Sequence, residues 1–138
     1  MFYYGKIKEP LNIKYMIISK DFHFEAAHHL RNYIGKCQFP HGHSYHGTVW
    51  VDGKRNEIGF VIDYGEISEI INYFDHKDLN ELPEFQELNP TAENIAYTIM
   101  IKLANKLTDT HDIAVKIHET ASSSAFKTTN PRLIFLAR

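Results

Sequence analysis

Residues 37–53 read CQFPHGHSYHGTVWVDG, and the alternation within this stretch predicts a β-strand over residues 41–51. Side chains alternate between the two faces of a strand, so His41 and His43 leave the backbone on the same face. Two imidazoles spaced in this way can clamp a metal ion, although an HxH pair also arises by chance in a chain with nine histidines. A catalytic zinc usually takes three protein ligands and leaves one position for water or substrate. One further ligand is therefore expected elsewhere in the chain.

A second alternating stretch, MIISKDFHFEAAHHL, covers residues 16–30 and predicts another strand. One of its faces is mostly apolar and should point into the core; it carries Ile18, Phe22, Phe24, Ala26 and His28. His28 lies at the end of this inner face, which makes it the inward histidine nearest the HxH pair. His29 is expected on the outer face, but a β-bulge would exchange the two histidines.

Cys37 is the only cysteine, so no internal disulfide can form. It is either a small buried hydrophobic residue or a reactive thiol. Its position four residues before His41 favours the reactive thiol.

The remaining segments predict two helices and two more strands. The first helix is expected over residues 64–74 with Asp63 as N-cap, and the second over residues 92–107 with Thr91 as N-cap. Strands are expected over residues 113–120 and 133–137, a turn at Asp52-Gly53, and a short extended piece over residues 60–62. The order strand, strand, helix, helix, strand, strand (ββααββ) predicts an α+β fold: a four-stranded antiparallel sheet with two helices on one face.

Glu119 falls on the same strand face as the apolar residues Val115 and Ile117. A carboxylate on an apolar face is costly unless it meets a partner, so Glu119 is a candidate contact for a ligand. The alternative is a residue at a strand end that already lies in water. His23, His46, His111 and His118 are expected to be surface or packing residues.

Composition predicts one domain, because 138 residues suffice for a single hydrophobic core. The net charge of −2 comes with no basic stripe, which argues against nucleic-acid binding. No apolar stretch is long enough to span a membrane, and the first residues do not resemble a signal peptide, so a cytoplasmic protein is expected. Residues 1–15 are expected to form an arm or an extra edge segment, with Met16 a candidate natural start and residues 16–138 the single catalytic domain.

Five separated motifs together resemble the 6-pyruvoyltetrahydropterin synthase/QueD family of pterin enzymes. They are FEAAHH ending at His29, CQFPHGH from Cys37 to His43, the pair Asp75-His76, PTAEN from Pro90 to Asn94, and HET around Glu119. The three residues between Cys37 and His41 match the 6-carboxy-5,6,7,8-tetrahydropterin synthase branch, since the pyruvoyl enzymes have a longer gap. Two departures are that His29 stands where many relatives carry arginine, and that ASSS follows the HET motif.

The resemblance implies a zinc-dependent lyase of the aldehyde-lyase type. It places one Zn²⁺ per subunit on His28, His41 and His43, a catalytic cysteine at Cys37, a catalytic pair at Asp75 and His76, and a pterin anchor at Glu119. The implied substrate is 7,8-dihydroneopterin triphosphate. The products would be 6-carboxy-5,6,7,8-tetrahydropterin, acetaldehyde and triphosphate, in 7-deazapurine synthesis such as that of queuosine.

The implied architecture is the tunnelling fold (T-fold), in which subunit sheets join into a barrel. Two trimers would pair into a hexamer, with Asp75 and His76 facing the zinc of a neighbouring subunit. The open edges of a four-stranded sheet are consistent with such pairing.

Three other functions are compatible with these residues. One is the sister pyruvoyl chemistry, which stops before carbon–carbon cleavage. Another is a structural zinc site of one cysteine and three histidines in a binding protein, with Cys37 as the fourth ligand. The last is a metal-dependent hydrolase that acts on an unrelated substrate.

Overall fold

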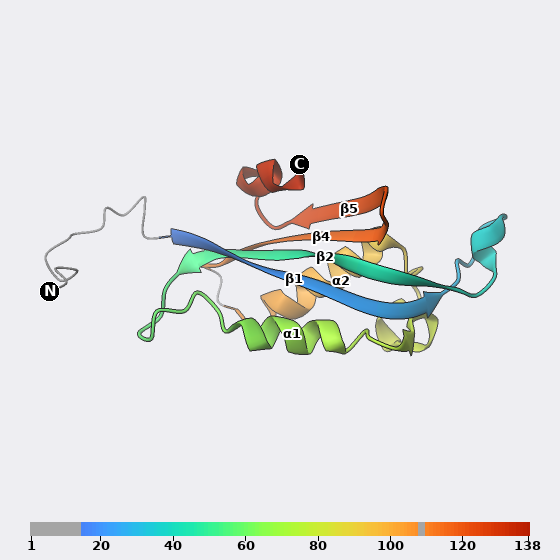
Figure 1. Cartoon of the computed structure of the whole chain (residues 1–138), viewed down its shortest axis with the longest axis horizontal. Coiled ribbons are helices and arrows are strands. Elements are labelled where there is room, and N and C mark those ends of the chain that lie inside the picture. The colour runs from blue at the N-terminus through green and yellow to red at the C-terminus, as the bar shows by residue number, and fades with distance from the viewer. Residues whose placement is uncertain (1–14, 108–109) are drawn as a thin grey trace, which may run out of the picture.

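The structure, a computed structural model, describes residues 15–107 and 110–138 and is α+β, as predicted (Figure 1). Its strands form one sheet in the order β3-β1-β2-β4-β5. The strands and α-helices are β1 (Tyr15–His28), β2 (His41–Lys54), α1 (Tyr64–Asn72), β3 (Lys77–Asp78), α2 (Ala92–Ala104), β4 (Asp112–Thr120) and β5 (Ser123–Thr128). Except for Tyr15, which is part of β1, the arm expected over residues 1–15 lies outside the described residues.

The long antiparallel pair of β1 and β2 dominates the sheet. Its register runs from Tyr15 opposite Lys54 to His28 opposite His41. The predicted alternation of β1 is confirmed, because Phe24, Ala26 and His28 are buried on one face. The register also brings the last residue of β1 directly opposite the first residue of β2.

The core lies between one face of the sheet and the two helices. Figure 1 shows α2 crossing behind the strands and α1 beside them. Asp63 caps α1 as predicted, accepting a hydrogen bond from the backbone N–H of Gly65 at 2.8 Å. Thr91 caps α2 through the N–H of Asn94 at 3.1 Å. Buried side chains of both helices join those of β1, β2 and β4 in a single cluster, which makes the opposite face of the sheet the one that α1 and α2 leave uncovered.

The prediction of a last strand over residues 133–137 was wrong. The strand beside β4 is β5, and Pro131–Ala137 is instead a 3-10 helix, η6. Asn130 caps η6 by accepting from the N–H of Arg132 at 2.9 Å, and Pro131 fixes the first helical position. The sequence of β5, SSAFKT, has too few apolar residues to reveal a strand through its pattern.

The turn predicted at Asp52-Gly53 was also wrong, because β2 continues to Lys54 and pairs with β1 throughout. Gly53 is required there for space: a Cβ atom would lie 2.4 Å from the ring of His111. The chain turns later, near Gly59, whose φ of +92° favours glycine. The extended piece expected over residues 60–62 is irregular, and the short parallel strand β3 was not predicted.

Asp52 is almost fully buried, and its carboxylate pairs with the guanidinium of Arg132 from η6. Arg132 also lies 3.7 Å from the Asp112 carboxylate. Because removing one partner leaves a buried charge unpaired, we expect Arg132→Ala to lower the free energy of unfolding by about 2–3 kcal/mol. This value allows for the exposure of the arginine side chain to water. Urea denaturation measures the loss.

The double variant Arg132→Ala with Asp52→Asn is the control for this ion pair. It should recover part of the loss, because asparagine brings no charge into the buried position. A single variant within about 0.5 kcal/mol of the wild type would contradict the assigned role.

Candidate metal centre

Three histidines meet at the end of the β1–β2 pair. His28 ends β1, and His41 and His43 begin β2 on the same face, as the alternation predicted. One ligand atom from each lies within 4.8 Å of the others, and the Nε2 atoms of His28 and His41 are 3.0 Å apart. This geometry could hold a metal ion, with the rigid strand pair fixing all three rings.

Backbone carbonyls orient two of these rings. The Nδ1–H of His28 donates to the carbonyl of Pro90 at 2.7 Å, and that of His41 to the carbonyl of Phe39 at 2.8 Å. A proton on Nδ1 leaves the lone pair on Nε2, which is the arrangement that ligating histidines adopt in metal sites. Burial also lowers the pKa of His28, which favours the neutral, metal-binding imidazole.

The ring of His43 tests whether the three histidines suit a metal ion. The Nε2 atom of His43 is buried and has no hydrogen-bond partner. Such an orphaned nitrogen is costly unless another group satisfies it. A metal ion bound to the three rings would do so, and the donor set of three imidazoles suits zinc.

Glu119 and Tyr45 complete the surroundings of the cluster. The Oε1 atom of Glu119, near the end of β4, lies 3.6 Å from Nε2 of His43. The hydroxyl of Tyr45 is 3.3 Å from Nδ1 of His28, and burial raises the pKa of Tyr45 well above its usual value, so it stays a neutral phenol. The structure therefore brings Glu119 to the three-histidine cluster, on the face its sequence position indicated.

Cys37 lies in a short 3-10 helix, Lys36–Gln38 (η3), within the segment that projects beyond the ends of β1 and β2 (Figure 1). Its side chain is half-buried, and its carbonyl accepts from the backbone N–H of Leu30 at 2.7 Å. The compact ligand group contains the three histidines but not Cys37. This arrangement favours an open metal site over a closed site of four protein ligands.

Asp75 and His76 directly precede β3, which pairs with β1 on the side opposite to β2. Their side chains contact each other at 3.0 Å, and the backbone N–H of Glu25 donates to Asp75 at 2.9 Å. This N–H holds the pKa of Asp75 below its usual range. His76 has a positive φ of 57° and a side chain that is 80% exposed.

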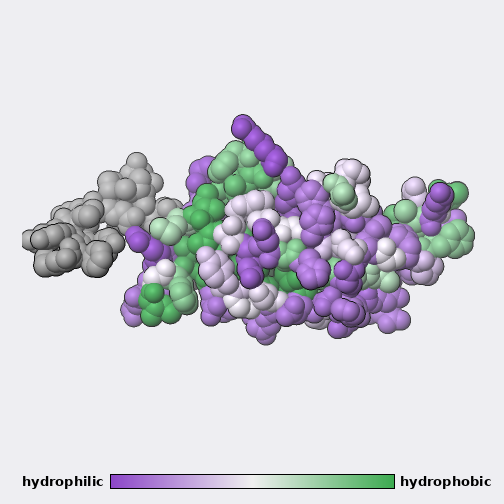
Figure 2. Space-filling view, in the orientation of Figure 1, coloured by the Kyte–Doolittle hydropathy of each residue, from purple (hydrophilic) through white to green (hydrophobic). Residues whose placement is uncertain are grey.

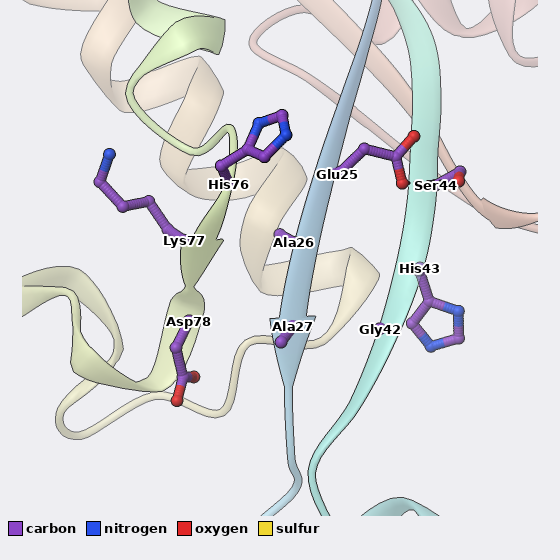
Figure 3. A pocket seen from close by; sticks show the side chains of 9 residues that line it. All are labelled: Glu25, Ala26, Ala27, Gly42, His43, Ser44, His76, Lys77 and Asp78. Atoms are coloured by element: carbon purple, nitrogen blue, oxygen red, sulfur yellow. Dashed lines mark hydrogen bonds between the residues drawn. The ribbon is translucent and has the colours of Figure 1, made fainter.

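The His76 ring overlooks a groove of about 530 Å³. Figure 3 shows the ring beside β1 on the side away from β2, whereas the His43 ring lies beyond β2. Residues from β1, β2 and the β3 segment line the groove: Glu25, Ala26, Ala27, Gly42, His43, Ser44, His76, Lys77 and Asp78. His43 and His76 thus line the same groove, but their rings lie on opposite sides of the β1–β2 pair and the compact ligand group does not include His76.

Comparison with known proteins identifies the family, since the family model described as 6-pyruvoyl tetrahydropterin synthase matches residues 17–130. The chain belongs to this family. The family predicted from the sequence motifs is thus confirmed. In the described part of the chain, no helix has the length and apolar character needed to cross a membrane.

Individual relatives agree with the family match. A Synechocystis protein named 6-carboxy-5,6,7,8-tetrahydropterin synthase is 37% identical over 128 residues, which cover 85% of this chain and 95% of that protein. An Archaeoglobus fulgidus protein with the same name, marked putative there, is 39% identical over 95 residues, which cover 66% of this chain and 78% of that protein. The structure of Caenorhabditis elegans 6-pyruvoyl tetrahydropterin synthase matches with a TM-score of 0.69 at 22% identity. The match covers 84% of this chain and 96% of that structure, and it shows that the two proteins share a fold.

A hydrogen-bond network that was not predicted from the sequence supports the backbone carbonyl of Pro90. Asn89 accepts from the backbone N–H of Arg31 and donates to its carbonyl, both at 2.8 Å. The Arg31 guanidinium also binds the carbonyls of Phe85, Gln86 and Leu88. Because these partners lie far from Arg31 in the sequence, no local pattern reveals them.

We expect Asn89→Ala to weaken metal binding about 10-fold or more, because the carbonyl that orients His28 loses its support. Competition against a chromophoric chelator measures the affinity. Gln86→Ala is the matched control, since Gln86 lies in the same loop but its side chain donates to Asn80 and Leu82. Equal affinities for the two variants would show that Asn89 does not support the site.

Proposed function

We propose that the chain is a zinc-dependent lyase that converts 7,8-dihydroneopterin triphosphate to 6-carboxy-5,6,7,8-tetrahydropterin. Acetaldehyde and triphosphate would leave, and atom balance requires one water. The family match and the names of the relatives support a tetrahydropterin synthase. The observation that carries the proposal is the cluster of His28, His41 and His43 with Glu119 beside it, since it joins a metal site to a carboxylate.

His28, His41 and His43 would hold the zinc ion, which supplies Lewis-acid polarisation of the substrate's side-chain oxygens. Glu119 would accept hydrogen bonds from a ring N–H and the exocyclic amine of the pterin, a match for its two carboxylate oxygens. Because Glu119 lies 3.6 Å from His43, a ring bound to it would place its side chain beside the metal ligands.

Proton transfer needs groups on either side of the substrate side chain. Cys37 would take a proton from a side-chain carbon as general base. His76 would give or accept protons on the other side, with Asp75 holding its ring at 3.0 Å. The ring would be reduced at the expense of the side chain, so the reaction needs no redox cofactor.

His76 would act in the site of a neighbouring subunit. Three observations support assembly: the His76 side chain is 80% exposed, it lies away from its own cluster, and the sheet has open edges. Ile34, between β1 and β2, and Ile58, between β2 and α1, are highly exposed, and Figure 2 shows hydrophobic surface near both ends of the described part of the chain. We propose a hexamer of two trimers, whose product feeds 7-deazapurine synthesis such as that of queuosine.

The deciding experiment incubates the zinc-loaded protein with 7,8-dihydroneopterin triphosphate and follows products by mass spectrometry. The proposal predicts equal amounts of acetaldehyde and C6-carboxylated tetrahydropterin. A pyruvoyl product without acetaldehyde would assign the sister activity instead. Absence of any pterin product from a folded, zinc-loaded protein would refute both.

A further inference from the structure

Residues 75–80 run along the edge of β1 and are bonded to it from their first residue onward. The backbone N–H of His76 donates to the carbonyl of Glu25 at 2.6 Å, and the Asp75 carboxylate accepts from the Glu25 N–H at 2.9 Å. The short strand β3 then continues beside β1 in parallel, as Figure 3 shows. The near end of this segment is therefore held by Glu25.

Asn80 holds the far end of the same segment. Its side-chain oxygen accepts from the backbone N–H of His29 at 2.8 Å, and its side-chain nitrogen donates to the His29 carbonyl at 3.0 Å. The amide side chain thus bonds both backbone groups of His29, as a neighbouring strand would, at the point where β1 has ended. Because Asn80 and His29 are 51 positions apart in the sequence, no local pattern reveals this clamp.

The backbone of Asn80 is fixed as well. Its N–H donates to the carboxylate of Asp78 at 3.1 Å, and its carbonyl accepts from the side chain of Gln86 at 2.8 Å. The preceding residue, Leu79, is fully buried in the core. Because both its backbone and its side chain are bonded, Asn80 is a fixed point for the residues that precede it.

His76 is the residue of this segment that depends most on being held at both ends. Its φ of 57° lies in the left-handed region, which residues other than glycine rarely adopt. Such a backbone persists only where the surrounding structure constrains it. The side chain of His76 is 80% exposed, so the backbone and the contact with Asp75, not packing, decide where the ring lies. Release of the far end would let the backbone relax and the ring move.

We infer that Asn80 is a positioning residue for His76. Through its two hydrogen bonds with His29, Asn80 holds the segment that carries His76 and thereby fixes the place of the imidazole. The inference rests on the proposed function, because Asn80 affects turnover in this way only if His76 transfers protons. His28 is held independently, by its pairing with His41 and by the Pro90 carbonyl, so Asn80 is not needed to hold the metal.

Hydrogen–deuterium exchange of residues 75–80, followed by mass spectrometry, tests the clamp without reference to the reaction. In Asn80→Ala this segment should exchange about 10-fold faster than in the wild type, because one of its two ends is released. Exchange in β4 and β5, on the other side of the sheet, should stay the same. Unchanged exchange of residues 75–80 would overturn the inference, whatever the activity of the variant.

Turnover tests whether the clamp acts through His76. Asn80→Ala should lower kcat about 10–100-fold, because a small displacement of a reacting group has an effect of this size, while KM and zinc content stay unchanged. In a His76→Gln background the same change should have no further effect, since no imidazole is left to position. An equal loss of kcat in both backgrounds would show a purely structural role and overturn the inference. If the wild type makes no pterin product, the proposed function fails, and the exchange result alone decides whether Asn80 holds His76.

Asn56→Ala is the matched control. Asn56 also bonds backbone groups through its side chain, accepting from the N–H groups of Ile58 and Phe60 at 3.1 and 2.9 Å, but it lies in the loop between β2 and α1. Its replacement should change neither the exchange of residues 75–80 nor kcat.

Asn80→Asp is a second variant, for the case that Asn80→Ala does not fold. Its carboxylate still accepts from the N–H of His29 but cannot donate to the His29 carbonyl. It should therefore keep the fold and show faster exchange and lower kcat, each by a smaller factor than expected for alanine. Wild-type exchange together with wild-type kcat in this variant would also contradict the inference.

Discussion

Replacement of His43 by alanine should lower the affinity for zinc more than about 100-fold. Loss of an outer-shell partner alone typically costs 10–100-fold, and His43 is a direct ligand in the proposed site. Its Nε2 atom is buried and makes no hydrogen bond, and the nearest acidic group, the Glu119 carboxylate, lies 3.6 Å away. Turnover should fall to background at zinc concentrations that saturate the wild type.

Chelator competition measures this affinity, and circular dichroism checks the fold. Ser44→Ala is the matched control, because Ser44 is the next residue of β2 but points to the opposite face, where its hydroxyl donates to Glu25 at 2.7 Å. The control should bind zinc as the wild type does. If the His43 variant also binds zinc normally, the ion is held elsewhere.

The three-histidine cluster could be predicted because it depends on a short-range rule. Alternation places His41 and His43 on one face, and the inner face of β1 ends at His28. The antiparallel register then sets His28 opposite His41, which the separate patterns of the two strands allowed but did not specify. Alternation favoured His28 over His29, and the unbroken register of β1 and β2 excludes the bulge that would have exchanged them.

Other features depended on contacts that a local pattern does not carry. The Pro90 carbonyl reaches His28 across 62 positions of sequence. The chain end was predicted as a strand because LIFLA is apolar, whereas Asn130 and Pro131 start a 3-10 helix there. Strand β5 was not predicted, because this edge strand contains mostly small or polar residues.

The positions of the proposed catalytic groups could not be predicted from strand alternation. The motifs suggested Cys37, Asp75 and His76 as partners of the metal, but the compact ligand group among the described residues contains only the three histidines. Alternation within a strand predicts nothing about η3, which lies between strands, or about a residue that would act in a neighbouring subunit. Their roles stay predictions that variants must test.

Cys37→Ala should reduce turnover by about 10²–10⁴-fold while zinc binding stays unchanged. The size follows from the usual contribution of a positioned general base. Unchanged zinc binding follows from the geometry, because the ligand group consists of three histidines without the Cys37 sulfur. Mass spectrometry of the products measures turnover, and zinc content is measured on the same sample.

Measuring zinc content and turnover on the same variant distinguishes two roles of Cys37, general base and fourth zinc ligand. A variant that keeps zinc and loses turnover places Cys37 in the chemistry, with the open metal position available to substrate. Loss of zinc and fold together would instead make Cys37 a fourth ligand and the site structural. Lys36→Ala is the control, since it changes the neighbouring residue of η3 and should preserve both zinc and turnover. Because the three histidines already meet without Cys37, we expect the first result.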